Sequence, residues 1–304
     1  MTRMARLLTA LAVLVILLMG ALYLMGHQLS APAFRPIGAP PPALQARQIE
    51  LTTAEGVPVA GWWSPGRPGM GTVLLLHGVR GDRRQMLQRA LFLHRQGRGA
   101  LLIDLPAHGE SGGTAITFGL RESEAVVAAL DFLVHEVPCE RRAVIGVSLG
   151  AASTVLAKGR PPLDAVVLES MFPTIEEAVA DRLKMRLGDW AGSLSPLLLT
   201  QLPLQLGISP RQLRPIEHIA ELQAPLLMIS GGEDRHTTAA ETQRIFAAAA
   251  SPKSLWMVPG AAHVDLLDFT PEAYTTRVSA FLDDHLRNAA CATAAVTTPR
   301  FGQP

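Results

Sequence analysis

Hydrophobic residues concentrate in eight short runs, and the later runs are apolar at nearly every position instead of at alternate ones. Unbroken runs of Val, Leu and Ile are typical of strands that are covered on both faces of a sheet. The first two runs, residues 47–53 and 58–64, predict an initial hairpin. The other six predict strands at residues 72–78, 99–105, 141–148, 164–170, 225–231 and 254–260.

Segments with a helical pattern separate these strands, at residues 83–96, 120–137, 149–159, 238–250 and 271–288. Strands that alternate with helices are joined by crossover connections, which place neighbouring strands parallel to one another with helices on both faces. The pattern therefore predicts the α/β class and a mostly parallel, doubly wound sheet of about eight strands.

Residues 171–222 interrupt this alternation with repeated prolines and no strand pattern. We expect an insertion of short helices that forms a small cap over the crevice beyond the carboxyl ends of the strands. Its apolar stretch, residues 196–206, leaves two interpretations open. These leucines either line a pocket for an acyl chain or pack the cap against the body of the domain.

The amino terminus carries an uncharged apolar segment, residues 7–25, that is long enough to nearly span a bilayer. Its length favours an uncleaved transmembrane anchor over residues 1–26, while the sequence APA at residues 31–33 keeps a cleaved signal peptide open as the alternative. Arg3 and Arg6 precede the segment, so the positive-inside rule predicts a cytoplasmic N-terminus. The domain would then lie across the membrane, or be secreted or periplasmic after signal cleavage.

The remaining boundaries follow from composition. The proline-rich residues 27–47 predict an extended linker, residues 48–289 a folded domain, and residues 290–304 a disordered tail. Hydrophobic residues make up 48% of the 304 positions and charged residues 17%, so the chain can bury one sizeable core. The formal net charge of +1 gives no electrostatic basis for binding nucleic acid.

Neither a metal nor a nucleotide cofactor is predicted. No cluster of His, Cys, Asp or Glu has metal-ligand spacing, and no G-x-G-x-x-G sequence opens a helix. The two cysteines, Cys139 and Cys291, match neither a metal site nor a disulfide framework, and they leave the redox compartment open.

Ser148 lies in the sequence GVSLG, between an apolar run and an alanine-rich helical pattern. A G-x-S-x-G sequence at a strand-to-helix turn is the elbow that exposes a serine nucleophile. Gly146 and Gly150 lack the Cβ atoms that would clash where the backbone doubles back. A serine that only caps a helix needs neither glycine, so the pattern favours a nucleophile.

A serine nucleophile needs a base and a third group that orients the base. Asp234 follows one predicted strand and His263 follows the next, which gives the chain order Ser, Asp, His that is used on this kind of sheet. Glu169, in the run 164–170, stays open as an alternative acid. The sequence predicts a triad of Ser148, Asp234 and His263.

The negative charge that develops on a carbonyl oxygen during acyl transfer needs two backbone amides. We predict one at Leu149, directly after the serine, and the other at Val79, in the loop after the run 72–78. His77 and Gly78 begin that loop, and we expect them to support its shape instead of acting as a base.

The sequences HGVRGD, IDLPAHGESGG, GVSLGA, LESMF, GGEDRHTT and GAAHVDLL together resemble those of the α/β-hydrolase superfamily, over residues 48–289. The chain is most similar to single-pass Bem46-like serine hydrolases and to their depalmitoylase and prolyl-oligopeptidase-type relatives. The resemblance implies an α/β-hydrolase fold and a serine hydrolase that acts on a small-molecule or lipid-like acyl ester. One departure is the asparagine that often follows His-Gly in these relatives, because this chain has Val79 there.

Other activities have to be separated from the cleavage of esters or thioesters. The same triad cleaves amides, so a serine peptidase or amidase stays open as the alternative. A non-catalytic binding protein is disfavoured, because such proteins usually lose a triad residue and this chain has all three. Haloalkane and epoxide hydrolysis on this fold usually require an aspartate at the elbow, where this chain has Ser148.

Overall fold

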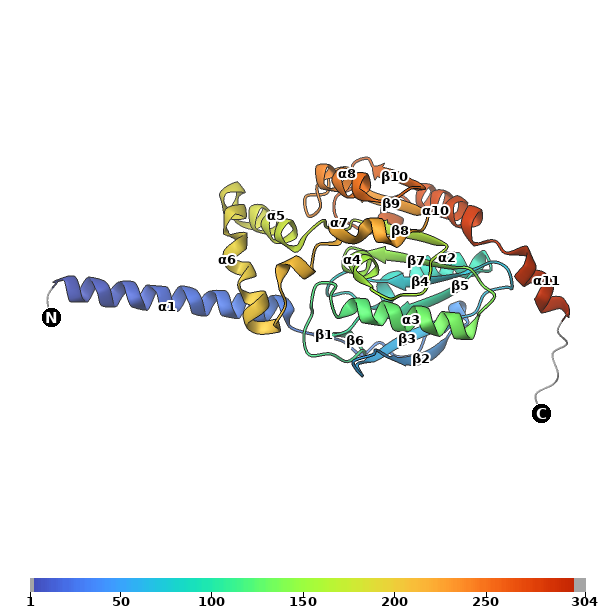
Figure 1. Cartoon of the computed structure of the whole chain (residues 1–304), viewed down its shortest axis with the longest axis horizontal. Helices are drawn as coiled ribbons and strands as arrows, with labels where there is room; N and C mark the ends of the chain where they lie inside the picture. The colour runs from blue at the N-terminus through green and yellow to red at the C-terminus, as the bar shows by residue number, and fades with distance from the viewer. Residues whose placement is uncertain (1–2, 298–304) are drawn as a thin grey trace.

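The computed structural model describes residues 3–297, and its centre is an eight-stranded sheet (Figure 1). In spatial order the strands are β10 (Lys253–Val258), β9 (Leu226–Gly231), β8 (Ala165–Glu169), β7 (Arg142–Val147), β4 (Thr72–Leu76), β5 (Gly99–Ile103), β3 (Pro58–Ser64) and β2 (Arg47–Thr52). Neighbours from β10 to β5 pair parallel, whereas β3 pairs antiparallel with both β5 and β2. The predicted mostly parallel sheet of eight strands is confirmed.

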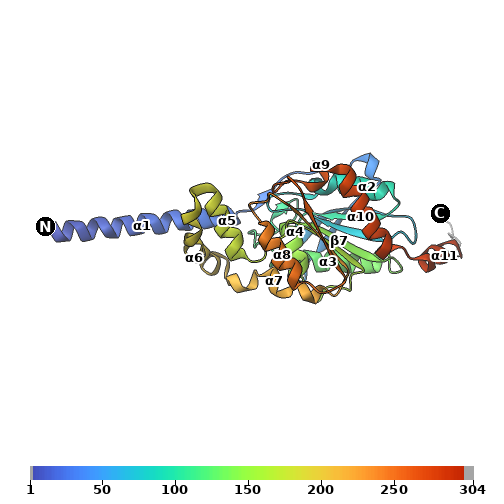
Figure 2. The ribbon, with the colours of Figure 1, turned by 90° about the horizontal axis from the view of Figure 1, so that it is seen from above.

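Helices cover both faces of the sheet (Figure 2). One face carries α3 (Glu122–Glu136), α4 (Leu149–Leu156) and α8 (Ala239–Ala248), and the other carries α2 (Leu87–Arg95), α9 (Leu266–Phe269) and α10 (Pro271–Leu286). Because side chains alternate along a strand, Leu74 and Leu76 of β4 enter the first core, and Val73 and Leu75 enter the second. Burial on both faces explains why the strand sequences are apolar without interruption.

Residues 171–222, which we call the cap, form helices and turns beside the carboxyl edge of the sheet (Figure 1). They are α5 (Ile175–Leu187), η3 (Asp189–Leu194), α6 (Ser195–Leu199), the π-helical turn η4 (Leu202–Leu206), η5 (Pro210–Gln212), α7 (Pro215–His218) and η6 (Ile219–Leu222). Leu199, Leu202 and Leu213 pack with Leu156 of α4 in a small separate core. Part of the apolar stretch therefore does pack the cap against the body.

Two carboxyl groups meet where the cap touches the body. Asp181 on α5 lies close enough to Glu241 on α8 to affect its ionisation, and Oδ2 of Asp181 is buried without a hydrogen-bond partner in the described residues. Burial and the neighbouring Asp181 raise the pKa of Glu241 to about 7, against the opposing effect of the Thr238 amide. Below that pH a protonated Glu241 can donate to the unpartnered oxygen of Asp181 between α8 and α5, and above it the two like charges repel.

The N-terminal helix α1 (Arg3–Ser30) is longer than the predicted anchor, and by length and composition it can cross a membrane. The linker also differs from the expected extended spacer, because its residues pack on the domain. The short strand β1 (Ala33–Phe34) pairs with β6 (His108–Gly109), and Leu44 is fully buried in the core. Neither short strand has a periodic sequence pattern, so their pairing was not predicted.

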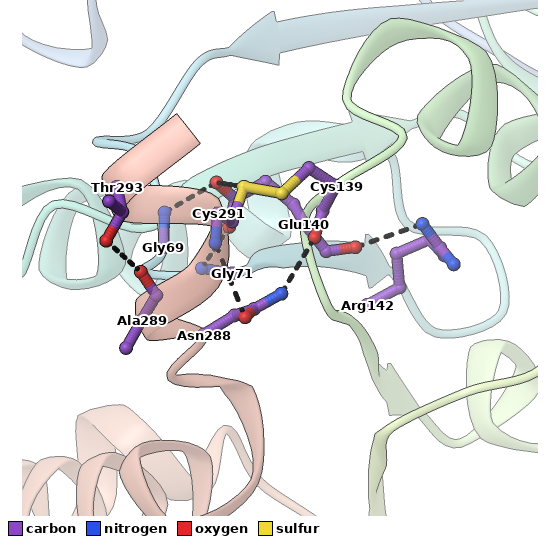
Figure 3. The surroundings of a disulfide bond; sticks show 9 residues. All are labelled: Gly69, Gly71, Cys139, Glu140, Arg142, Asn288, Ala289, Cys291 and Thr293. Atoms are coloured by element: carbon purple, nitrogen blue, oxygen red, sulfur yellow. Dashed lines mark hydrogen bonds between the residues drawn. A yellow bond between two sulfur atoms is a disulfide. The ribbon is translucent and has the colours of Figure 1, made fainter. Parts of the chain in front are cut away.

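The C-terminal prediction is wrong for part of the tail. Residues Ala289–Thr297 form the helix α11, and a disulfide between Cys139 and Cys291 joins it to the segment after α3 (Figure 3). Asn288 supports this contact, because its side chain donates to the Cys139 carbonyl at 3.0 Å and its amide donates to the Gly69 carbonyl at 2.9 Å. Residues 298–304 lie outside the described residues.

The disulfide closes a loop of 152 residues, so its loss should destabilise the domain by about 2–4 kcal/mol. We expect Cys139→Ser, Cys291→Ser and a reductant on the wild type to lower the melting temperature equally. The reductant should have no further effect on either variant, which serves as the control. If reductant did not change the melting temperature of the wild type, the prediction would be contradicted.

The Asp181 and Glu241 pair should make the stability depend on pH. Glu241 has a pKa raised by folding, so its contribution is complete below about pH 4.5 and is lost as the pH rises through about 7. Glu241→Gln cannot ionise and keeps a donor for Asp181. Its melting temperature should therefore fall less than that of the wild type between pH 5 and pH 8.5. Glu217→Gln removes an exposed cap carboxylate and should melt with the wild-type pH profile.

Candidate active site

Ser148 sits in a sharp turn between β7 and α4. Its backbone has φ 49° and ψ −102°, a conformation that L-residues rarely adopt and that costs free energy. A Cβ on Gly150 would lie 2.5 Å from the Leu76 carbonyl oxygen, and one on Gly146 would lie 2.7 Å from the Ala151 nitrogen. The turn therefore closes only with glycine on both sides of the Val-Ser-Leu segment.

Neighbouring strands hold this turn from both sides. The Ser148 amide donates to the Glu169 carbonyl on β8 at 2.8 Å, and the Gly150 amide donates to the His77 carbonyl after β4 at 3.1 Å. The strained serine is thus tied to the two strands that flank β7 in the sheet.

Asp234 and His263 come together at the carboxyl ends of β9 and β10. Nδ1 of His263 lies 2.7 Å from Oδ2 of Asp234, and Oδ1 accepts from the amides of His236 at 2.7 Å and Thr237 at 3.0 Å. Burial of the Asp234 carboxyl opposes its ionisation, but His263 and the two amides outweigh burial and lower its pKa. Asp234 is therefore an anion that can fix the orientation of the imidazole.

The hydroxyl of Ser148 makes no hydrogen bond to His263 in the structure of residues 3–297, although both rise from the same sheet edge. Catalytic contacts of this kind are often long without substrate and shorten when it binds. The ring of His236 stacks on His263 with centroids 4.7 Å apart and planes at 25°. This stacking restricts how far the imidazole of His263 can turn.

The loop after β4 supplies the second predicted amide. Leu149 begins α4, so its amide has no acceptor within the helix. The amide of Val79 likewise has no acceptor in the described part of the chain, and Val79 lines the same pocket as Ser148 and Leu149. Both amides are therefore free to bind an oxygen.

His77 is a structural residue of that loop. It is fully buried, and burial and the neighbouring His108 lower its pKa to about 3. The neutral ring donates from Nδ1 to the Gly78 carbonyl at 2.8 Å and accepts the Leu105 amide at Nε2 at 3.0 Å. The Gly78 amide donates to Gln85 at 2.9 Å. Both ring nitrogens are occupied, so His77 has no free position for a base.

The carboxylate of Glu169 binds residues of α2 and α10. It accepts from Arg89 at 2.7 and 3.0 Å and from the hydroxyl of Tyr274 at 2.5 Å. Arg89 also binds Asp265, which caps the N-terminus of α9 just after His263. The alternative acid is thus occupied by an ion pair, and no hydrogen bond within residues 3–297 joins it to His263.

A pocket of ≈ 250 Å³ opens beside Ser148, and its walls are mainly apolar. Phe118 from the body and Phe172 and Leu199 from the cap line it. The apolar stretch 196–206 therefore both lines the pocket and packs the cap against the body. Arg182 on α5 and Gly26 on α1 also line it. Neither residue stands out in the sequence, because arginines are common on the surfaces of helices and glycines are common in membrane helices.

A metal ligand set is absent from residues 3–297, where no group of three or more His, Cys, Asp or Glu could hold an ion.

Comparison with known proteins places the chain among related sequences. A family model described as the alpha/beta hydrolase family matches residues 73–277. An uncharacterized protein of Mycobacterium tuberculosis is 33% identical over 275 residues, which cover 86% of this chain and 91% of that protein. An uncharacterized protein of Bacillus subtilis is 25% identical over 244 residues, which cover 77% of this chain and 78% of that protein.

Solved structures with the same fold include an esterase and a phospholipase. An esterase of Pyrococcus furiosus is similar with a TM-score of 0.70 and 24% identity, covering 85% of this chain and 98% of that one. A membrane phospholipase A is similar with a TM-score of 0.58 and 17% identity, covering 92% of this chain and 98% of that one. At these identities the likeness concerns the fold.

Proposed function

The chain belongs to the alpha/beta hydrolase family, and on that premise we propose that it is a serine hydrolase that cleaves carboxylic esters or thioesters. The observation that carries the proposal is the contact of 2.7 Å between Asp234 and His263 at the sheet edge where Ser148 sits in a strained turn. Strain of this kind is stored at functional sites, and a buried carboxylate on Nδ1 is what a histidine base requires.

In this mechanism the hydroxyl of Ser148 attacks the substrate carbonyl while Nε2 of His263 removes its proton. Asp234 keeps Nδ1 protonated and stabilises the imidazolium that forms. His263 then gives the proton to the departing alcohol or thiol, and a water molecule releases the acyl group by the same steps. Leu149 and Val79 donate their amides to the oxyanion, and one such donor is worth roughly 3–4 kcal/mol of barrier.

An ester or thioester fits the pocket better than a peptide does. Its walls are mainly apolar, with Phe118, Phe172 and Leu199 around the serine, which suits the hydrocarbon part of an acyl group. Similar folds include an esterase and a membrane phospholipase A, and both of these names denote ester cleavage. Amide hydrolysis is the second outcome that the assays below must separate.

The membrane placement is part of the proposal. We propose that α1 stays attached as a single membrane span with its N-terminus in the cytoplasm and the domain outside. Arg3 and Arg6 at its start support this orientation. The disulfide between Cys139 and Cys291 supports an oxidising compartment for the domain, since disulfides are rare in the cytosol.

Labelling by a fluorophosphonate probe tests the nucleophile. The full-length protein should be labelled and should hydrolyse acyl esters of graded chain length faster than peptide amides. Ser148→Ala should abolish both signals. Ser153→Ala is the matched control, because its buried hydroxyl bonds the Leu149 carbonyl on the same helix and should be dispensable for labelling. Labelling that survives Ser148→Ala would refute the mechanism.

A second variant tests the acid. Asp234→Asn should hold His263 in the wrong tautomer and reduce kcat for an ester about ten-thousandfold with little change in KM. The fluorophosphonate rate should fall in parallel. If Asp234→Asn retained near-wild-type kcat, the acid would have to be another carboxylate.

A further inference from the structure

The last turns of α1 form one wall of the pocket beside Ser148. Gly26 and Leu29 of α1 line it together with Leu202 and Leu206 of the cap. A Cβ on Gly26 would lie 2.7 Å from Cβ of Gln201 on the cap, so only glycine lets the two elements approach this closely. The pocket is therefore enclosed in part by the helix that we place in the membrane.

Hydrogen bonds fix α1 in this position from two sides. Gln205 of the cap donates to the carbonyl of Tyr23 at 2.8 Å. Arg80, in the loop that carries the predicted oxyanion amide of Val79, donates to the carbonyl of Gln28. Both the cap and the loop after β4 are thus joined to α1, which extends away from the body beyond this contact (Figure 1). Its residues 7–25 continue the apolar wall outward.

The charges that face the pocket have one sign. Arg80, Arg182 and Arg186 line it, and no aspartate or glutamate does so within the described residues. Arg182 is half-buried and donates to the Ala178 carbonyl of its own helix at 2.8 Å, but it forms no ion pair in residues 3–297. Asp181 pairs through Oδ1 with Lys184 and Asp234 pairs with His263, and neither forms an ion pair with Arg182, although their charges act on it.

An unpaired, half-buried guanidinium is costly unless a ligand brings the negative charge. Burial lowers the pKa of Arg182 against the nearby charges of Asp234 and Asp181. Burial and His263 lower the pKa of His236, the ring that stacks on His263, and the charge of Arg182 adds to this effect. Arg182 therefore acts electrostatically on the ring beside the candidate base. A guanidinium in this position suits a phosphate, which it can bind through two parallel hydrogen bonds.

We propose that the substrate is a membrane phospholipid, a long-chain acyl ester with an anionic phosphate, which enters from the bilayer along α1 and binds its phosphate at Arg182. This inference rests on the proposed serine hydrolase activity and names its substrate class. The acyl carbon leaves the glycerol oxygen for Oγ of Ser148, and the glycerol oxygen departs with the proton that His263 took from the serine. Water then releases the fatty acid.

The test uses the full-length protein in vesicles of a diether phosphatidylcholine, which contains no carboxylic ester. Dioleoyl phosphatidylglycerol or dioleoylglycerol is added in equal amounts, and the release of oleate is measured. We expect the phosphate-bearing ester to be hydrolysed at least about tenfold faster, since a charged hydrogen bond is worth that much or more. Dihexanoyl phosphatidylglycerol, dissolved below its micelle concentration, measures the same chemistry without a bilayer.

Arginine variants test the phosphate site through the ratio of the two rates. Arg182→Gln should lower the preference for the phosphate-bearing ester about tenfold. Arg182→Lys keeps the charge but loses the two parallel N–H donors of the guanidinium, and it should lower the preference less. Arg211→Gln is the matched control, because it removes an exposed arginine of the cap that lies outside the pocket. It should leave the preference at the wild-type value.

Glycine variants test the path along α1. Gly26→Leu should push α1 away from the cap and lower the rate on bilayer phosphatidylglycerol relative to the soluble dihexanoyl ester about tenfold. Gly20→Leu is the matched control on the same helix, because a Cβ at that position meets open space.

Two kinds of failure are distinguishable. Wild type that reacts with the fluorophosphonate and cleaves the soluble ester, but shows equal rates on the two dioleoyl esters, would overturn the phospholipid inference alone. The same holds if Arg182→Gln and Arg211→Gln have the same preference. Wild type that neither reacts with the probe nor cleaves any ester would instead refute the proposed function.

Discussion

The buried guanidinium of Arg89 is the interaction on which the geometry behind the candidate site depends. It joins Glu169 at the end of β8, Tyr274 of α10 and Asp265 at the start of α9. Removing one partner from such a network would leave an uncompensated buried charge, which costs about 3–5 kcal/mol. The loop with His263 ends at Asp265, the residue that caps the N-terminus of α9. The position of the histidine therefore depends on the ion pair between Asp265 and Arg89. Glu169 contributes twice, because its carboxylate binds Arg89 while its carbonyl accepts the Ser148 amide.

Close steric contact also fixes the position of the serine turn. Gly150 packs against the Leu76 carbonyl so closely that β4 and α4 can meet only at a residue without a side chain. This contact holds the serine turn against the loop that carries Val79 and His77. The strained serine and the two free amides thus belong to one closely packed unit, and Asp234 and His263 approach it from the ends of β9 and β10, beyond β8 in the sheet.

The sequence predicted the sheet well because burial on both faces leaves an apolar run that can be recognised locally, as in residues 72–76 and 142–147. The pairing of β1 with β6 involves two residues on each side and has no such pattern. The cysteine pair spans 152 positions, and nothing local marks its partners. Ser148, Asp234 and His263 could be named because strand ends and chain order are visible in the sequence. Arg182 could not, because its importance depends on a pocket built from α1, the cap and the body together.

The two described ends of the chain lie at opposite poles of the molecule, with α1 beside the cap and α11 on the far side (Figure 1). For a helix retained in a bilayer, this polarity turns the carboxyl edge of the sheet toward the lipid surface and the disulfide-linked helix away from it. Enzyme and lipid would then meet by lateral diffusion in a shared plane. The encounter rate would depend on their densities per unit area of membrane and on its fluidity, while solubility in water would have no part in it.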